Sequence, residues 1–557
     1  MNTEEAIARA HAAFERRDFS TARRLLGDLD HPRAFHLLGL IERRSGNLNA
    51  AAVWLEKAAG AQGEDHELAH NRGLVAKQLG QLDVAEQHFL RSIELKTDFS
   101  QAYASLGRLM IDLERWDEAA SLYRQHLQLD PQSVTGRYGS GIVQLETGSP
   151  AEAEALFDAL ILEETDRPAI RFMRGRARLE LGELDTALAD LQSSHASEPT
   201  VLSFRALANQ YWMRGQDEQF TALIESSASH PELIPVAAEA LRQSEQPEAG
   251  LAHLSSLSTS ATLAADCAGV RSMCEIDCGK AKRAELSARA CIEAGSANLV
   301  VQGALIVSLL MQGRAEQALV EIQRRRSAEP LGQHWIGYET IAYRLMGSTK
   351  YRQLADPNDV VRIYEIPTPR GFDNVASFND EFATLLNKYH RYRRRPLDQS
   401  LRHGTQSYRN LVNIADPVFD AYFAALDGPI SDYLEQMGRS NEHPLSMRNT
   451  GSYQIADCWS VRLGTGGYHT DHVHPRGWIS SSYYVSVPDS EGSQESISGG
   501  SIRFGHPPFP MQPEISAEKW IQPKAGMVVL FPSYLWHGTE PISGGCRVTA
   551  PFDVLPA

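Results

Sequence analysis

The sequence lacks several features that would place the protein in a special class. No apolar run is long enough to cross a lipid bilayer, and the acidic, amphipathic start has no signal-peptide core. Cysteine is scarce, with six residues in a chain of 557, so a disulfide framework is not expected. These absences predict a protein of the reducing cytoplasm that has no membrane partner.

Positive charge is also in short supply. The chain has 54 lysine and arginine residues against 70 aspartate and glutamate residues, which gives a formal net charge of −16. This balance argues against a general binder of nucleic acid or of anionic membranes. The hydrophobic and charged fractions are ordinary for a globular protein. The length exceeds what one hydrophobic core usually serves, so we expect at least two domains.

The N-terminal part is periodic, with several residue types recurring every 34 positions. All five copies have a glycine at a fixed place, an alanine twelve residues later and a large residue after sixteen. Four of the five copies also have a second glycine seven residues after the first. The first glycine would let two helices approach, the second would lie at their turn, and the large residue would fill the core. The columns are Gly39, Gly73, Gly107, Gly141 and Gly175; Gly46, Gly80, Gly148 and Gly182; Ala51, Ala85, Ala119, Ala153 and Ala187; and Leu55, Phe89, Tyr123, Phe157 and Leu191.

This period and pattern resemble the tetratricopeptide repeat over residues 1–345. The resemblance implies an all-α superhelix of nine or ten helix pairs whose concave face binds a peptide or packs on a neighbouring domain. The repeat register between residues 228 and 300 stays open. Cys267, Cys274 and Cys278 lie here at helical spacing, which could indicate a metal site but is more typical of buried packing residues.

After the repeats the rhythm fades. Residues 346–375 contain several prolines and are predicted to be a junction before a C-terminal domain over residues 376–557. A helix is expected from Asn379 to about Tyr392. The basic run from His390 to Pro396 could contact an acidic partner or a substrate carboxylate, although a solvated or inter-domain salt-bridging face is favoured.

The C-terminal domain shows short β-rich runs after a helix predicted near Asp416–Met437. Helices packed on an antiparallel barrel or double sheet fit this order. The predicted strands cover residues 453–455, 459–463, 468–474, 480–487, 501–504, 527–531 and 547–552.

Four possible metal ligands, His469, Asp471, His472 and His474, fall within six residues of this domain. On a strand, residues two apart share a face, so the cluster offers either His472 with His474 or His469 with Asp471. A third ligand must come from a distant strand, and His537 is the candidate. Downstream, Arg547 and Thr549 also share a face, and an arginine beside a hydroxyl suits a carboxylate ligand.

This arrangement resembles that of the double-stranded β-helix (jelly-roll) iron(II)/2-oxoglutarate oxygenases. It consists of two ligands two residues apart, a distant histidine and an arginine beyond that histidine. The supporting motifs include QSLRHGTQS, HVHP with ISSSYYVSVP behind it, and PKAGMVVLFPS. The resemblance implies that His472, His474 and His537 hold Fe(II), and that Arg547, Thr549 and Tyr484 hold 2-oxoglutarate. It implies hydroxylation of a substrate, which the repeats suggest is a peptide or protein.

Two questions stay open in the sequence. Leu463 and Gly466 precede His472 at the spacing common in the superfamily, which favours the pair His472 and His474. That register puts histidine where the superfamily usually has a carboxylate. The pair His469 and Asp471 is the rival.

The functional rivals are a repeat scaffold whose barrel has lost catalysis and a cupin-like metal enzyme without 2-oxoglutarate. The oligomeric state is not indicated.

Overall fold

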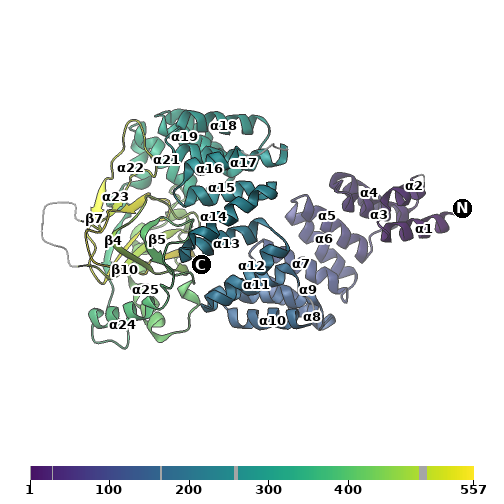
Figure 1. Cartoon of the computed structure of the whole chain (residues 1–557), viewed down its shortest axis with the longest axis horizontal. Helices are drawn as coiled ribbons and strands as arrows, with labels where there is room; N and C mark the ends of the chain where they lie inside the picture. The colour runs from purple at the N-terminus through teal and green to yellow at the C-terminus, as the bar shows by residue number, and fades with distance from the viewer. Residues whose placement is uncertain (1, 28, 164–165, 256–260, 489–498) are drawn as a thin grey trace. The chain divides into compact units, whose positions relative to one another are not determined.

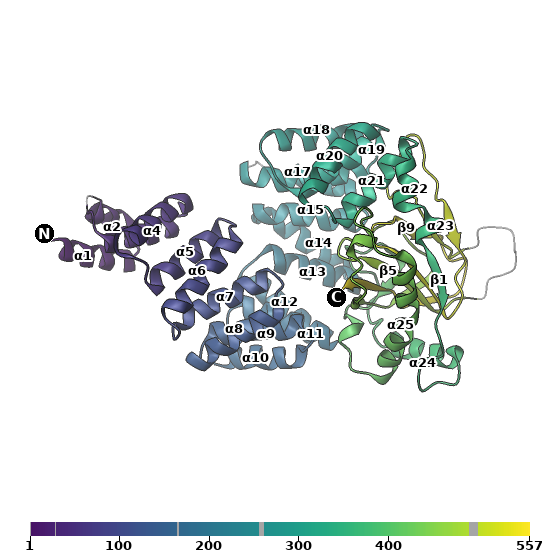
Figure 2. The same ribbon diagram turned by 180° about the vertical axis from the view of Figure 1, so that it is seen from behind.

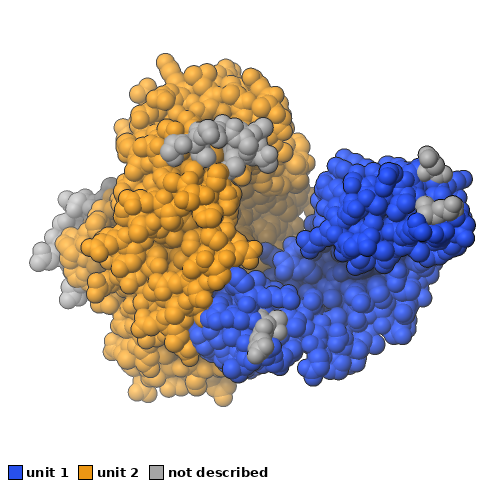
Figure 3. Space-filling model, turned by 45° about the vertical axis from the view of Figure 1, so that its right-hand side comes forward, with its two compact units in different colours: residues 1–181 blue, residues 182–557 orange. Residues whose placement is uncertain are grey.

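The computed structural model describes residues 2–27, 29–163, 166–255, 261–488 and 499–557 (Figure 1). The chain divides into two compact units, residues 1–181 and residues 182–557, which Figure 3 shows in different colours. None of the described helices combines the length and the apolar character that a bilayer-spanning segment needs. The domain boundaries predicted from the sequence at residues 345 and 376 stay predictions.

The first unit consists of helices paired in antiparallel fashion. The helices are α1 (Thr3–Glu15), α2 (Phe19–Leu26), α3 (Pro32–Arg44), α4 (Leu48–Gln62), α5 (His66–Gln78), α6 (Leu82–Leu95), α7 (Ser100–Asp112), α8 (Trp116–Leu129), α9 (Val134–Glu146), α10 (Pro150–Leu162) and α11 (Pro168–Leu181).

The repeating glycines act as the sequence predicts. A methyl group added at Gly73 would lie 2.6 Å from the ring of Phe89, and one at Gly141 would lie 2.7 Å from that of Phe157. Each large residue is the one sixteen positions after its glycine, and both rings are fully buried. The second glycines of the copies end the first helix of each pair with positive φ, for example +76° at Gly80. Close approach and a left-handed turn therefore explain both glycine columns.

Replacing Gly141 with alanine is expected to lower the stability of the first unit by about 1–3 kcal/mol, because the new methyl group overlaps a buried ring. The urea midpoint of helix unfolding, followed by circular dichroism, measures this effect. Gly60, an exposed glycine inside α4 with nothing near its Cβ position, provides the matched control. Its replacement by alanine should stabilise the unit by about 0.5–1 kcal/mol. Equal effects at both positions would contradict the packing explanation.

The second unit begins with further helix pairs and ends with the β-rich domain. Its helices are α12 (Leu184–Ser197), α13 (Val201–Arg214), α14 (Asp217–Ser226), α15 (Ile234–Gln243), α16 (Pro247–Leu254), α17 (Ala261–Asp277), α18 (Ala281–Glu293), α19 (Leu299–Met311), α20 (Ala315–Ala328), α21 (Gln333–Leu345), α22 (Thr349–Ala355), α23 (Pro357–Val360), α24 (Val375–Asn387) and α25 (Pro417–Met437). Residues 256–260, inside the stretch whose repeat register the sequence left open, lie outside the described residues.

The strand pairs among the described residues of the domain are all antiparallel. The larger sheet has the order β1-β8-β5-β10-β4-β2, with β11 pairing with β5 and β3, and a second sheet has the order β7-β6-β9. The strands are β1 (Arg362–Glu365), β2 (Leu401–Gln406), β3 (Tyr453–Cys458), β4 (Val461–His469), β5 (Ile479–Ser486), β6 (Ile502–Phe504), β7 (Lys519–Ile521), β8 (Met527–Pro532), β9 (His537–Thr539), β10 (Arg547–Thr549) and β11 (Phe552–Pro556). The predicted fold class, helical repeats followed by a jelly-roll type β domain with flanking helices, is confirmed.

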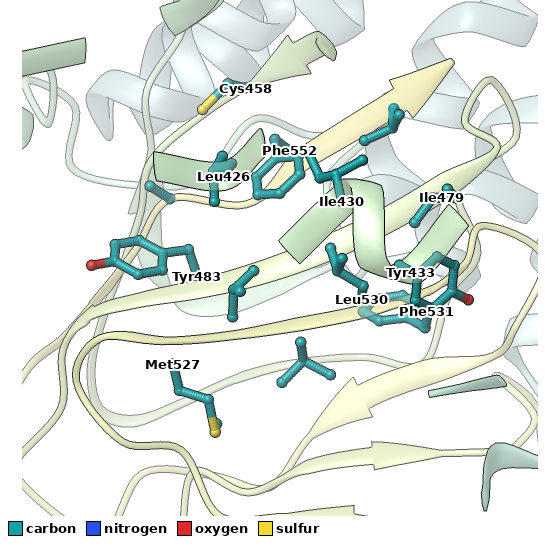
Figure 4. Close-up of a cluster of buried hydrophobic side chains, with 14 of the residues drawn as sticks. Leu426, Ile430, Tyr433, Cys458, Ile479, Tyr483, Met527, Leu530, Phe531 and Phe552 are labelled. Carbon is teal, nitrogen blue, oxygen red and sulfur yellow. The ribbon is translucent and has the colours of Figure 1, made fainter. Parts of the chain in front are cut away.

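The core of this domain forms between β5, β8 and β11 on one side and α24 and α25 on the other (Figures 1 and 2). Strand β5 carries three consecutive serines followed by Tyr483, Tyr484 and Val485, and β8 is buried along its whole length. Figure 4 shows Leu426, Ile430 and Tyr433 of α25 facing Phe531 and Phe552 of the sheet. Two buried strands thus give the site a rigid floor.

Three local predictions need correction. The strand expected over residues 468–474 ends at His469, because the chain turns away after that residue and makes only an isolated bridge further on. The helix expected from Asn379 to Tyr392 runs from Val375 to Asn387, since the Asn374 side chain caps its first turn. The predicted strand over residues 547–552 is divided into β10 and β11.

The last repeat helices pack directly on the β domain. Trp536 donates a hydrogen bond from Nε1 to the carbonyl of Gly337 in α21 (2.8 Å), and its ring lies 5.6 Å from that of Tyr338. Arg344 of the same helix donates to the carbonyl oxygens of Gly505 and Ser516. We call this contact between α21 and the loops around Trp536 the aromatic seam. Trp536 belongs to the same apolar cluster as the cores of α19 and α20.

The basic run from His390 to Pro396 makes a second contact with repeat helices. Arg394 forms an ion pair with Asp217 of α14 (2.5 Å), and the backbone nitrogens of Arg393 and Arg394 donate to the carbonyl of Met213. Arg395 is buried and donates to the carbonyl of Gln243 (2.7 Å). The favoured interpretation, a salt-bridging face between parts of the chain, is confirmed for Arg394.

Candidate metal centre

Backbone pairing brings the two histidine segments together. His472 and His537 form an isolated antiparallel bridge, with N–O distances of 2.9 and 3.1 Å in the two directions. The backbone nitrogen of His474 donates to the carbonyl of Ser533 (2.9 Å). His537 opens β9, directly after the fully buried strand β8 and the turn that follows it. The side chains of these three histidines therefore meet.

The hydrogen bonds of the three rings define which nitrogens are free for a ligand. The Nδ1 of His472 lies 2.9 Å from the carbonyl oxygen of Thr470, and that of His537 lies 2.9 Å from the carbonyl oxygen of Leu535. Because a carbonyl oxygen only accepts, both Nδ1 atoms carry the proton and both Nε2 atoms present a lone pair. The Nε2 atoms of His472 and His474 lie 3.3 Å apart. Such facing acceptors are typical of a cation site.

In the part of the chain that the structure describes, this is the one group of three or more possible ligand side chains that could share a metal ion. One donor atom from each of the three histidines lies within 4.8 Å of the other two. Burial, together with the neighbouring His474, lowers the pKa of His472 to about 4. Burial also holds the pKa of His537 well below its usual range. Neutral imidazoles, the form that binds metals, are therefore favoured here.

A carboxylate stands directly behind the cluster. The Nδ1 of His474 lies 2.7 Å from Oδ1 and 2.9 Å from Oδ2 of Asp553, a residue of β11. The hydroxyl of Ser480 donates to the same Oδ1 atom (2.7 Å), and Asp553 is only 8% exposed. A carboxylate that accepts from a ligand histidine fixes the ring and raises its basicity. The imidazole ring of His474 thus separates the negative charge of Asp553 from the place where the three Nε2 atoms meet.

The rival pair is placed differently. The carboxylate of Asp471 is buried and accepts from Arg503 (2.6 and 3.1 Å), with the Nδ1 of His506 at 2.9 Å. Its charge is therefore balanced away from the three histidines. His469 lies at the edge of the cluster, where its Nδ1 is 3.0 Å from the hydroxyl of Ser400. The structure brings together His472, His474 and His537 and leaves Asp471 out of the group.

The histidines lie in a cavity of about 570 Å³ that also exposes Arg547 and Thr549. Both residues come from β10, which lies between β4 and β5, and Thr549 pairs with Tyr484 across the sheet. Arg547 is 3% exposed and donates from Nη1 to the carbonyl of Gly500 (2.6 Å). Its guanidinium carbon lies 5.7 Å from the centre of the Tyr484 ring. The buried, positively charged guanidinium group of Arg547 therefore lies in the same cavity as the histidines.

Two polar atoms beside the cavity have no hydrogen-bond partner among the described residues. They are the Nε of Arg547 and the hydroxyl of Tyr484, and both are buried. Burial raises the pKa of Tyr484 and lowers that of Arg547, although the guanidinium keeps its proton under any physiological condition. Buried donors without acceptors carry a free-energy cost, which an anionic ligand would remove. The residues present therefore fit both a metal ion and a carboxylate.

Comparison with known families agrees with this geometry. Residues 457–553 match the family model described as "Putative 2OG-Fe(II) oxygenase". Residues 70–134 and 110–177 match tetratricopeptide repeat models. The chain joins tetratricopeptide repeats to a domain of this oxygenase family. The name of the family implies iron(II) and 2-oxoglutarate as cofactor and cosubstrate.

The curated proteins that resemble this chain are similar to it over only part of their length. Protein FlbA of Caulobacter vibrioides is 26% identical over 197 residues, which is 34% of this chain and 33% of that protein. A human protein, Protein O-mannosyl-transferase TMTC3, is 31% identical over 80 residues, which is 14% of this chain and 9% of that protein. The chain spans about a third or less of the curated relatives that it matches.

Among solved structures, a tetratricopeptide repeat protein from Parabacteroides merdae is 18% identical, with a TM-score of 0.32. The alignment covers 55% of this chain and 98% of that chain. PilF of Pseudomonas aeruginosa is 14% identical with a TM-score of 0.33, and the alignment covers 36% of this chain and 95% of that one.

Sequence reasoning missed two residues of the site, Asp553 and Ser400. Asp553 carried a signal, since it is an acidic residue between the apolar residues Phe552 and Val554 of a strand. A buried acid in such a run usually has a specific partner. Ser400 lies 3.3 Å from the Nε2 of His472, at the start of the motif before β2, and nothing in its spacing indicates that contact.

Proposed function

We propose that the chain is an iron(II)- and 2-oxoglutarate-dependent oxygenase that hydroxylates a peptide or protein substrate. The observation that carries the proposal is the convergence of three Nε2 lone pairs in a cavity with a buried arginine whose Nε has no partner among the described residues. Tetratricopeptide surfaces typically bind peptides, which supports a polypeptide substrate presented by the repeats.

Each residue of the site has a distinct task in this proposal. His472, His474 and His537 would hold iron(II) through Nε2 and leave further coordination positions open. Arg547 would bind the far carboxylate of 2-oxoglutarate through its guanidinium fork, with the hydroxyl groups of Thr549 and Tyr484 beside it. Iron(II) with 2-oxoglutarate supplies the activation of dioxygen that oxidises a C–H bond. The protein orients these groups and excludes water from the cavity floor, which β5 and β8 form.

The carboxylate that the superfamily usually places on the metal is replaced here by Asp553 behind His474. Three neutral imidazoles alone would leave the full charge of the metal uncompensated, and Asp553 reduces that charge through its bond to the ring. This arrangement supports a metal site despite the absence of a carboxylate at position 474.

One experiment separates an oxygenase from a scaffold that merely binds metal. The protein is purified without oxygen, loaded with iron(II), and titrated with 2-oxoglutarate, and succinate formation is then measured after oxygen is admitted. Binding of 2-oxoglutarate together with slow succinate release without substrate supports the proposal. Iron binding without either signal would assign the chain to the catalytically inactive alternative.

Replacing Asp553 with asparagine is expected to weaken iron(II) binding by about 10- to 100-fold, because the ring partner remains while its charge is lost. The amide oxygen of asparagine can still accept from the Nδ1 of His474, so the ring stays oriented. Titration of the metal-free protein with iron(II) measures the effect, and the thermal midpoint checks the fold. The alanine variant removes charge and orientation together. If only the alanine variant loses affinity, Asp553 serves orientation alone.

A further inference from the structure

A second cavity, of about 670 Å³, lies where the basic run meets β2, β4 and the α13 helix. We call it the arginine pocket. It shares no lining residue with the metal cavity. Glu245 is the one acidic residue among its described lining residues, against five arginines. These arginines are Arg393, Arg394, Arg395, Arg402 and Arg462. Such an excess of positive charge is unexpected in a chain with a net charge of −16.

The protein's own carboxylates neutralise only part of this charge. Arg394 is paired with Asp217, while Arg395 (3.6 Å) and Arg402 share the single carboxylate of Glu245. Arg393 and Arg462 have no carboxylate within ion-pair distance in the described part of the chain, and both side chains are exposed. Three arginines are therefore held by the fold, and two reach into the pocket without a counter-charge.

The walls hold the paired arginines in fixed positions. The guanidinium of Arg394 lies 4.6 Å from the centre of the Trp212 ring, and that of Arg395 lies 5.9 Å from it. Burial, together with the neighbouring Arg402, lowers the pKa of Arg395 to about 10. His390 adds no charge, because burial lowers its pKa to about 4 and its two ring nitrogens lie 2.9 Å from the hydroxyls of Thr405 and Ser460. Trp212 thus orients the two paired guanidinium groups that form one wall of the pocket.

We propose that the arginine pocket binds a small ligand carrying at least two anionic groups, either phosphates or carboxylates. The guanidinium fork matches both groups, and the volume is in the range of about 300–1,000 Å³ that is usual for small-molecule sites. Arg393 and Arg462 supply the two guanidinium groups without a carboxylate partner among the described residues, while Arg402 and Arg395 define the floor. This inference concerns a site separate from the metal cavity and does not depend on the proposed function.

The two sources of anionic groups are distinguished with two probes, pyrophosphate and glutarate. Each is titrated calorimetrically into the full chain without added iron, since pyrophosphate itself binds iron. The test variant carries Arg393→Gln together with Arg462→Gln. Its control carries Arg9→Gln together with Arg91→Gln, two exposed arginines of the first unit that change the net charge equally. Circular dichroism checks that each variant is folded.

At least one probe is expected to bind the native chain, and the test variant should lose about tenfold or more in affinity, since two charge-assisted hydrogen-bonding groups are removed. Binding of pyrophosphate alone would identify a phosphate ligand, and binding of glutarate alone a carboxylate ligand. The control should bind like the native chain. Failure of both probes to bind, or equal affinity in the test variant, would overturn the proposal. So would loss of glutarate binding in Arg547→Gln, because the ligand would then occupy the metal cavity.

Discussion

Iron(II) binding is expected to be lost when His474 is replaced by alanine and to persist when Asp471 is replaced by asparagine. His474 provides one of three converging Nε2 atoms, whereas the carboxylate of Asp471 is held by Arg503 and His506. Outer partners of metal ligands alone are worth about 10- to 100-fold in affinity, so removal of a ligand should cost more than about 100-fold. Iron content after anaerobic loading and gel filtration measures both variants.

The Asp471 variant also needs a stability control. Among the described residues, its substitution leaves Arg503 with Glu540 alone as a carboxylate partner, so the fold should lose about 1–3 kcal/mol without losing the metal. Thermal unfolding of the metal-free variants separates the two effects. Loss of iron from a folded Asp471→Asn protein, together with retention by His474→Ala, would show that the metal uses the pair His469 and Asp471.

Binding of 2-oxoglutarate is expected to fail when Arg547 is replaced by alanine, while iron(II) binding stays close to that of the native chain. Loss of one partner of a buried, hydrogen-bonded charge pair costs about 2–5 kcal/mol, so affinity should fall by at least about 30-fold. Calorimetric titration of the iron-loaded protein under nitrogen measures it. Arg547 does not contact the three histidines through any hydrogen bond that the structure shows.

Arg409 provides the matched control for this test, because it lines the same cavity but lies half-buried at another wall. Its replacement by lysine should leave 2-oxoglutarate affinity unchanged. If the Arg409 variant loses the cosubstrate and the Arg547 variant keeps it, the carboxylate site has been assigned to the wrong wall of the cavity.

The repeats could be predicted in detail because their determinants are local. A glycine and the ring sixteen residues later belong to one helix pair, so the 34-residue period records a direct contact such as that between Gly73 and Phe89. The turn glycines follow the same logic, since each needs a positive φ at one position. Patterns of this kind express packing between neighbours in the sequence, and they survive without knowledge of the remaining fold.

The sequence predicted the three histidines that the structure brings together, but for a partly wrong reason. Strand alternation suggested that His472 and His474 share a face, but the strand ends at His469. Their side chains meet because backbone bonds to His537 and Ser533 hold the two residues separately. Asp553 was missed because its role depends on β11 pairing with β5, a contact between segments more than seventy residues apart. Non-local pairing of this kind leaves little trace in spacing.

The aromatic seam has a consequence for how such a chain can be recombined. Trp536 immediately precedes His537, and α21 holds its indole nitrogen and ring. An array of repeats exchanged from another protein at the start of the β domain would replace the surface on which Trp536 rests and could displace the histidine next to it. Exchange ahead of residue 182, where a separate compact unit ends, would leave that surface whole. Exchange of repeats is therefore expected to be tolerated in the first unit and constrained in the repeats that follow it.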